Sequence, residues 1–187
     1  MKSDDFLTLS PRGKVPLLED DGFVLPESMA AIAYLDRKHP EQTLFGATPE
    51  ETGKIWHCVL DFDLYVSEHW VNNIIAPIVT GQAEQAQATI QQGAKDAHRE
   101  LAKLEKNLSD RDWFVGSGVS AADIAIYPLL EALVRFATKP AVSHLDLGFD
   151  RFDTDYPQLN NWRKRIQELP GYNKTYPDYW RETDAGG

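Results

Sequence analysis

Cysteine and positive charge are both scarce in this sequence. The 187 residues include one cysteine, Cys58, which excludes an internal disulfide and a zinc site made of four cysteines. Lys and Arg number 19 against 29 Asp and Glu, so the formal net charge is −10. A field of this sign repels a phosphate backbone, and we therefore expect no nucleic-acid partner.

A long hydrophobic run is also missing. The longest apolar-rich stretch, Ile124 to Val134, is far below the roughly 20 residues that span a bilayer. Two acids, Asp4 and Asp5, stand where a signal peptide needs positive charge. We expect no membrane partner, and together with the lone cysteine these features favour a cytoplasmic location.

The glycine-rich motifs of nucleotide-binding proteins and the Gly-x-Ser-x-Gly motif of hydrolases are absent. His57, Asp61 and Tyr65 recur every four residues on one predicted helix face. No second histidine joins them at ligand spacing, so we interpret them as a polar stripe and expect no metal site. Cys58 lies among apolar residues and is interpreted as a packing residue rather than a nucleophile.

The first forty residues carry the signals of a β-hairpin followed by a helix. Two short β-type runs, 15–19 and 23–25, flank the turn signal Asp20-Asp21-Gly22. A helix is predicted to start after Glu27 and Ser28 and to end near His39, because a proline disfavours helix in the residue before it. A connector over 41–47 follows.

Helix signals alone follow the connector. Thr48 supplies an N-cap before Pro49, and a long helix is predicted from there to about Ile75. From Ala86 to Leu108, apolar residues recur at steps of three and four. We interpret this second helix as one of an antiparallel bundle rather than a dimeric coiled coil, because alanine dominates its first half.

A capping box, Ser120 with Asp123, opens the next helix, whose residues are apolar all round. We expect this helix to be the buried centre of the bundle and Asp123 to be buried with it. A last clear helix is predicted to begin at Pro157 and to be stopped by Pro170. The aromatic tail over 172–180 is predicted to pack back on the bundle.

This arrangement resembles the cytosolic glutathione S-transferase superfamily. The segments that carry the resemblance are Ser10 to Pro16, Leu25 to Ser28 with Ala31-Ile32 and Tyr34-Leu35, Ser120 to Asp123, and Tyr156 to Trp162. The resemblance implies an α+β, mostly α fold. Residues 1–41 would form a partial thioredoxin-like, glutathione-binding domain made of the hairpin and one helix, and residues 42–187 an all-α C-terminal domain.

Half of a glutathione site is implied by the same resemblance. Val15, before Pro16 in a cis peptide bond, would offer its backbone amide and carbonyl to the cysteinyl unit, as an added strand does. Ser28 at a helix start would bind the γ-glutamyl carboxylate, and Glu27 the ammonium group. Lys14 and Arg12 would meet the glycyl carboxylate. Taken alone, Ser28 is better explained as a plain N-cap, and only its company with Val15, Pro16 and Glu27 favours the binding role.

The chain departs from the family pattern at its start. Family members begin with a strand-helix-strand unit that ends near the Tyr, Ser or Cys that activates the glutathione sulfur, and this unit is missing here. Neither Ser3 nor Ser10 matches that position, so no catalytic residue is carried over. A mis-assigned start, a covering partner chain and a degenerate family member are all compatible with the missing unit.

Two functions remain open at this stage. In one, the protein is a glutathione transferase or reductase that takes a small apolar or electrophilic substrate in a groove around Trp56, Tyr65 and His69. The resemblance implies that this enzyme is a homodimer. In the other, it is a non-catalytic protein-interaction module, like the glutathione-transferase-like domains attached to translation factors.

Overall fold

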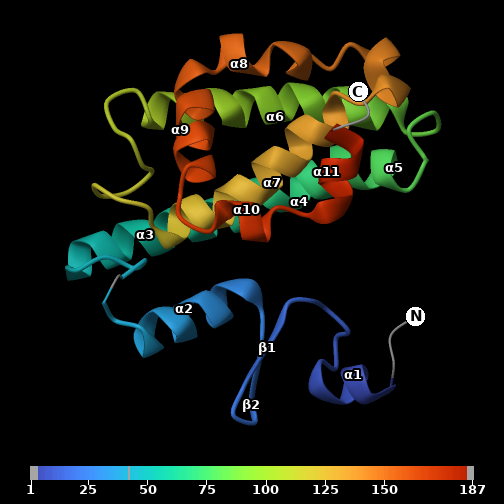
Figure 1. The fold of residues 1–187 in the computed structure, drawn as a ribbon. Helices are drawn as coiled ribbons and strands as arrows, with labels where there is room; N and C mark the ends of the chain where they lie inside the picture. The colour runs from blue at the N-terminus through green and yellow to red at the C-terminus, as the bar shows by residue number, and fades with distance from the viewer. Residues whose placement is uncertain (1–3, 42, 185–187) are drawn as a thin grey trace.

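The computed structural model describes residues 4–41 and 43–184, so Ser3 lies outside the described residues. The N-terminal part holds one short helix, two strands and one longer helix, shown in blue in Figure 1. These elements are α1 (Asp4–Leu9), β1 (Leu17–Asp20), β2 (Phe23–Pro26) and α2 (Ser28–Lys38).

The predicted hairpin is present, with β1 and β2 paired antiparallel from Leu17↔Pro26 to Asp20↔Phe23. Its two-residue turn needs a left-handed backbone at both positions, and Asp21 (φ 49°) and Gly22 (φ 83°) supply it. Asp20, at the end of β1, accepts hydrogen bonds from the Tyr34 hydroxyl (2.8 Å) and from Lys38, both on α2. The hairpin is thereby attached to the helix that follows it.

The connector is tied to both parts of the chain. Asp36 on α2 accepts hydrogen bonds from the Leu44 amide and from the Thr43 hydroxyl. The Leu44 carbonyl in turn accepts one from the Ala121 amide (2.8 Å), at the start of the central helix. The domain boundary predicted at 41/42 falls beside these residues and stays a prediction.

The rest of the described chain is helical and forms a bundle above the N-terminal part in Figure 1. Its elements are α3 (Pro49–Phe62), η1 (Asp63–Ser67), α4 (Glu68–Trp70), η2 (Val71–Ile75), α5 (Ala76–Val79), α6 (Gln87–Asn107), α7 (Ala121–Ala137), η3 (Pro140–Leu145), η4 (Phe149–Arg151), α8 (Phe152–Asp155), α9 (Pro157–Gln167), α10 (Tyr172–Thr175) and α11 (Asp178–Asp184). The predicted cap is confirmed, because the Thr48 side chain accepts from the Glu51 amide.

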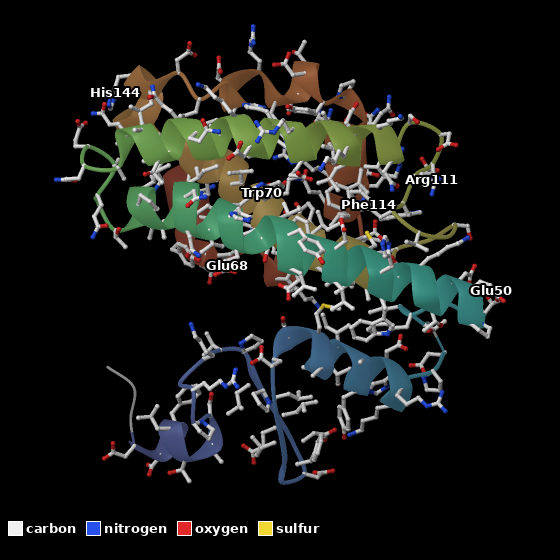
Figure 2. The ribbon with its side chains drawn as sticks, turned by 180° about the vertical axis from the view of Figure 1, so that it is seen from behind. Glu50, Glu68, Trp70, Arg111, Phe114 and His144 are labelled. Carbon is white, nitrogen blue, oxygen red and sulfur yellow. The ribbon has the colours of Figure 1, made fainter. Side chains whose placement is uncertain are left out.

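One expected helix differs from the prediction. The path expected as a single α-helix to about Ile75 continues to Val79 and contains two π-helical segments, η1 and η2. Its buried residues recur mostly at steps of four: Ile55, Val59, Phe62, Val66, Trp70 and Ile74. An α-helix advances about 100° per residue, so three steps of four would rotate them about 120° away from the core. The wider π-turns keep these side chains on the buried face, and Figure 2 shows Trp70 on the side toward α6.

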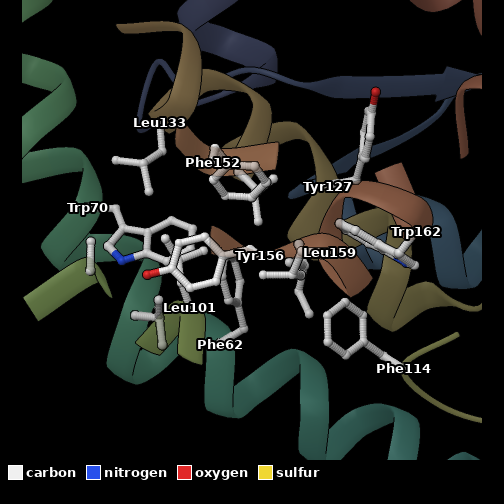
Figure 3. Close-up of a cluster of buried hydrophobic side chains, with 14 of the residues drawn as sticks. Phe62, Trp70, Leu101, Phe114, Tyr127, Leu133, Phe152, Tyr156, Leu159 and Trp162 are labelled. Carbon is white, nitrogen blue, oxygen red and sulfur yellow. The ribbon is translucent and has the colours of Figure 1, made fainter. Parts of the chain in front are cut away.

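The core lies around α7, as predicted, and draws large side chains from every layer of the bundle (Figure 3). Ile126, Leu130 and Leu133 on α7 are fully buried. The aromatic tail also packs back as predicted, because the Tyr172 hydroxyl lies 2.7 Å from the Tyr127 hydroxyl on α7. Within the described residues, no helix is long and apolar enough to cross a membrane.

Two helical glycines are expected to respond in opposite ways to substitution by alanine. Gly93 lies at the close contact between α6 and η2, and Gly53 faces solvent on α3. A Cβ on Gly93 would lie 2.9 Å from the Cβ of Asn73 and 3.0 Å from Cγ1 of Ile74. Gly93→Ala is therefore expected to lower the free energy of unfolding by about 1–3 kcal/mol. Gly53, exposed on α3, would meet nothing within 4 Å. Gly53→Ala is expected to raise stability by about 0.5–1 kcal/mol through helix propensity.

Urea unfolding of both variants measures these changes. Equal stability of the Gly93 variant and the parent would show that α6 and η2 do not approach as closely as described.

Candidate functional site

The hairpin register brings two predicted site segments together. Leu17 pairs with Pro26 at the open end of the hairpin. Val15 and Pro16 immediately precede Leu17 in the sequence, and Glu27 and Ser28 immediately follow Pro26, so both segments begin at this end of the hairpin. The residues that sequence reasoning placed in one half-site therefore meet at one end of one hairpin.

A tight turn presents Val15 at this end. The Gly13 amide donates to the Ser10 carbonyl (2.7 Å), which closes a turn with Pro11 at its second position and Gly13, at φ 59°, at its fourth. The buried Ser10 hydroxyl donates to the Lys14 carbonyl at 3.0 Å. Ser10 therefore shapes the segment before Val15. This role of Ser10 was not predicted, although Ser-Pro-x-Gly is a turn signature.

The Val15–Pro16 peptide bond is cis, as the resemblance implies. Val15 is 76% exposed and precedes β1. Within residues 4–41 and 43–184, neither its amide nor its carbonyl takes part in a backbone hydrogen bond. A free backbone donor and acceptor at a strand end can pair with an extended peptide.

Glu27 and Ser28 form the other side of the site. Glu27 is the N-cap of α2 with φ 76° and ψ 123°, a conformation that costs a non-glycine residue on the order of 1–3 kcal/mol. Ser28 is the first helical residue, so it does not occupy the cap position that was its alternative explanation. Both side chains are exposed. An amide and a hydroxyl at the N-terminus of an eleven-residue helix favour an anionic group.

Charged groups of both signs surround this end of the hairpin. Lys14 and Arg12 are exposed before Val15, and Glu27 is exposed at the start of α2. In the described part of the chain, none of these three side chains forms an ion pair. The arrangement offers cations and an anion to a zwitterionic peptide.

The predicted substrate groove is less clearly assembled. Trp56 on α3 stacks against Phe45, with ring centroids 5.1 Å apart, and is partly buried against the core. Tyr65 is 67% exposed and His69 is exposed as well, on η1 and α4. All three residues lie on the helical path from α3 to α4, but Trp56 is partly buried whereas Tyr65 and His69 are exposed to solvent.

The polar stripe on α3 lines a separate cavity. His57, Cys58 and Asp61 face a volume of about 340 Å³, together with Lys103 on α6 and Arg111 in the loop after it. Burial raises the pKa of the Cys58 thiol to about 11, and the negative charges of Asp123 and Asp61 add to the shift. A thiol with this pKa stays protonated at neutral pH, which agrees with its interpretation as a packing residue.

Cys58 is therefore expected to react slowly with alkylating reagents. At pH 7, iodoacetamide should modify the folded chain about 100-fold more slowly than the urea-unfolded chain, whose thiol titrates near 8.5. Mass spectrometry of timed samples measures both rates. Comparable rates in the two states would contradict the assignment of Cys58 as a buried, protonated thiol.

Three features define the fold class: the hairpin that follows a cis-proline, the helix after the hairpin, and the helical bundle. This class is a thioredoxin-like N-terminal part followed by an all-α domain of the glutathione S-transferase type. Two family models match the sequence. One describes a glutathione S-transferase N-terminal domain over residues 1–38, and the other a glutathione S-transferase C-terminal domain over residues 87–165.

Individual proteins agree with these models. The chain is 28% identical to glutathione S-transferase GstB of Escherichia coli over 91% of this chain and 76% of that protein. It is 32% identical to elongation factor 1-gamma of Danio rerio, over 86% of this chain and 33% of that protein. The crystal structure of glutathione transferase URE2P8 from Phanerochaete chrysosporium, solved with oxidized glutathione, covers 98% of this chain at 23% identity. The match spans 79% of that structure, with a TM-score of 0.78. The chain belongs to the glutathione S-transferase superfamily.

Proposed function

We propose that this protein binds glutathione at the open end of the hairpin. The observation that supports this most directly is the pairing of Leu17 with Pro26, which leaves the unpaired backbone of Val15 and the start of α2 at Ser28 at the same end of the hairpin. An anionic peptide of three units needs backbone pairing for its centre and charged or helix-end donors for its carboxylates.

Each group of the proposed site then has one role. Val15 pairs through its backbone with the cysteinyl unit, and Pro16 adds no competing donor. Ser28 donates its hydroxyl and amide to the γ-glutamyl carboxylate, where the helix dipole favours negative charge. Glu27 accepts from the ligand's ammonium group. Lys14, with Arg12, meets the glycyl carboxylate.

The proposed reaction is conjugation or reduction of a small apolar electrophile. Its proposed groove contains Trp56, Tyr65 and His69, and no residue of this chain is assigned as catalytic. A homodimer in the cytoplasm belongs to the same proposal. The dimer comes from the family resemblance, and the cytoplasmic location from the single cysteine and the acidic start of the sequence.

A second candidate is a protein-interaction module without catalytic activity. The observation in its favour is the 32% identity to elongation factor 1-gamma, of which this chain covers a third. Glutathione binding separates the two candidates, because an interaction module has no need of an intact peptide site.

Ser28→Ala is expected to weaken glutathione binding by about 1–3 kcal/mol, the cost of removing one partner of a charged hydrogen bond. Isothermal titration calorimetry of the parent and the variant measures this difference. Ser117→Ala, at an exposed loop position far along the chain, is the matched control and should bind as the parent does.

Equal affinity of the parent and the Ser28 variant would remove Ser28 from the site. A parent chain that binds no glutathione would contradict the proposed function and favour the interaction module.

A further inference from the structure

Ser10 carries a buried hydroxyl in an otherwise exposed part of the chain. The residue is 2% exposed, whereas in the segment 11–16 that follows it only Gly13 is buried. Burying a hydroxyl costs free energy unless the hydroxyl forms a hydrogen bond. The contacts of Ser10 therefore indicate what its burial achieves.

Three hydrogen bonds fix Ser10. Its amide donates to the Phe6 carbonyl on α1 (2.8 Å), and its carbonyl accepts from the Gly13 amide (2.7 Å). Its hydroxyl donates to the Lys14 carbonyl (3.0 Å). The backbone of Ser10 is thus held by α1 on one side and by the turn over 10–13 on the other, and its side chain reaches the first residue beyond the turn.

The Lys14 carbonyl belongs to the same peptide unit as the Val15 amide. This unit is trans, because the cis bond recorded in the described ranges is the next one, Val15–Pro16. In a trans peptide unit the C=O and N–H groups lie in one plane and point in opposite directions. A carbonyl held toward Ser10 therefore turns the Val15 N–H away from the buried hydroxyl. Nothing in the part of the chain that the structure describes accepts a hydrogen bond from this N–H.

The bond from Ser10 also strengthens the Val15 amide as a donor. A hydrogen bond accepted by a peptide carbonyl polarises the whole unit, so that its N–H group becomes a better donor. The Val15 amide is thus oriented and polarised before a ligand arrives, and a preorganised donor costs less to engage. Without the Ser10 hydroxyl, the peptide unit between Lys14 and Val15 loses the contact that fixes its direction.

We propose that Ser10 is a positioning residue of the hairpin half-site, which acts through the Lys14 carbonyl to aim the Val15 N–H at the ligand. This inference rests on the proposed function, because the ligand is the cysteinyl unit of glutathione. Ser10 itself is assigned no contact with that ligand.

Isothermal titration of the whole chain with glutathione, under a reductant, tests this role. Ser10→Ala removes the hydroxyl and should weaken binding about three- to tenfold. Ser10→Cys introduces a weaker donor of similar size, so its affinity should lie between those of the parent and of Ser10→Ala. Thr8→Ala is the matched control, because the Thr8 hydroxyl also donates to a backbone carbonyl, that of Asp4 (3.0 Å), but within α1. Its affinity should equal that of the parent.

The amide proton of Val15 reports directly on the proposed orientation. In ¹H–¹⁵N spectra, saturating glutathione should move this proton of the parent downfield, because a carbonyl acceptor deshields it. In Ser10→Ala at saturation the movement should be less than half as large, and in Thr8→Ala it should be unchanged. A residue that only stabilised the fold would leave the saturated position of this signal where it is in the parent.

Each contrary result has a distinct meaning. Equal affinity of the parent and of every Ser10 variant that unfolds cooperatively would remove Ser10 from the half-site, and a weakened Ser28→Ala would then leave the proposed function standing. Weaker binding by Ser10→Ala with an unchanged Val15 signal would overturn the positioning role. A parent that binds no glutathione overturns the proposed function and the role of Ser10 with it. Ser10→Cys decides the outcome if Ser10→Ala does not fold.

Discussion

Asp123→Ala is expected to lower the free energy of unfolding by about 3–4 kcal/mol, a large share of the 5–15 kcal/mol typical of a domain. The Asp123 carboxylate is fully buried and accepts four hydrogen bonds. Oδ2 accepts from the Ser120 amide (2.9 Å) and hydroxyl (2.7 Å). Oδ1 accepts from the Phe114 amide (3.1 Å) and from Nε1 of Trp162 (2.8 Å). Alanine would leave these four donors buried and unpaired.

Burial raises the pKa of Asp123, and the four hydrogen bonds oppose this shift. The carboxylate joins the start of α7, the loop before it and α9, so its loss should weaken the fold and not a ligand site. Thermal and urea unfolding measure the change, with exposed Asp150→Ala as the matched control, expected within about 0.5 kcal/mol of the parent.

Asp123→Asn keeps one carbonyl oxygen but turns an NH₂ group toward donors, so it should also be destabilising. If both Asp123 variants unfold with the parent while glutathione binding or activity falls, the structural assignment of Asp123 is wrong.

Glu131→Leu is expected to lower the free energy of unfolding by about 2–4 kcal/mol. Glu131 on α7 and Arg163 on α9 form a bidentate ion pair in which the side chains are 13% and 15% exposed. Removing one partner leaves the other charge largely buried, which costs more than the pair itself contributes. Asp153, 3.5 Å from Arg163 but 69% exposed, compensates only in part.

The double variant Glu131→Leu/Arg163→Met tests this reason directly. With both charges removed, apolar side chains of similar size fill the space, and the chain should be more stable than the Glu131 variant. Urea unfolding of the three proteins measures the coupling. A double variant less stable than Glu131→Leu alone would show that the pair stabilises the bundle by more than mutual neutralisation.

The hairpin and the caps could be predicted because their signals are local. The two-residue turn at Asp21-Gly22, the Thr48 cap and the Ser120 box each depend on residues within a few positions of one another. The buried faces of α6 and α9 likewise follow from periodicity alone. The half-site segments were found through the family resemblance, and the register then brought them to one end of the hairpin.

The two π-helical segments could not be predicted with the same rules. The steps of four from Phe62 to Ile74 were visible in the sequence, but an α-helix was assumed. Val66, Trp70 and Ile74 can all reach the core only if the helix widens, and their common burial is seen only in the tertiary structure. The role of Ser10 was missed for a different reason: the Ser-Pro-x-Gly turn is visible in the sequence, but the hydrogen bond from the Ser10 hydroxyl to the Lys14 carbonyl depends on how that turn folds.

The sequence by itself determined the hairpin, the main helices, their order and the family to which they belong, because these depend on spacing along the chain. The tertiary structure decided which distant residues share an environment. Trp162 reaches Asp123 across 39 positions, and Tyr172 reaches Tyr127 across 45. These contacts depend on how α7, α9 and the C-terminal segment pack, and packing is set by the summed burial of side chains from all layers. A cavity between α7 and the segment 169–180 exists only as a result of that packing.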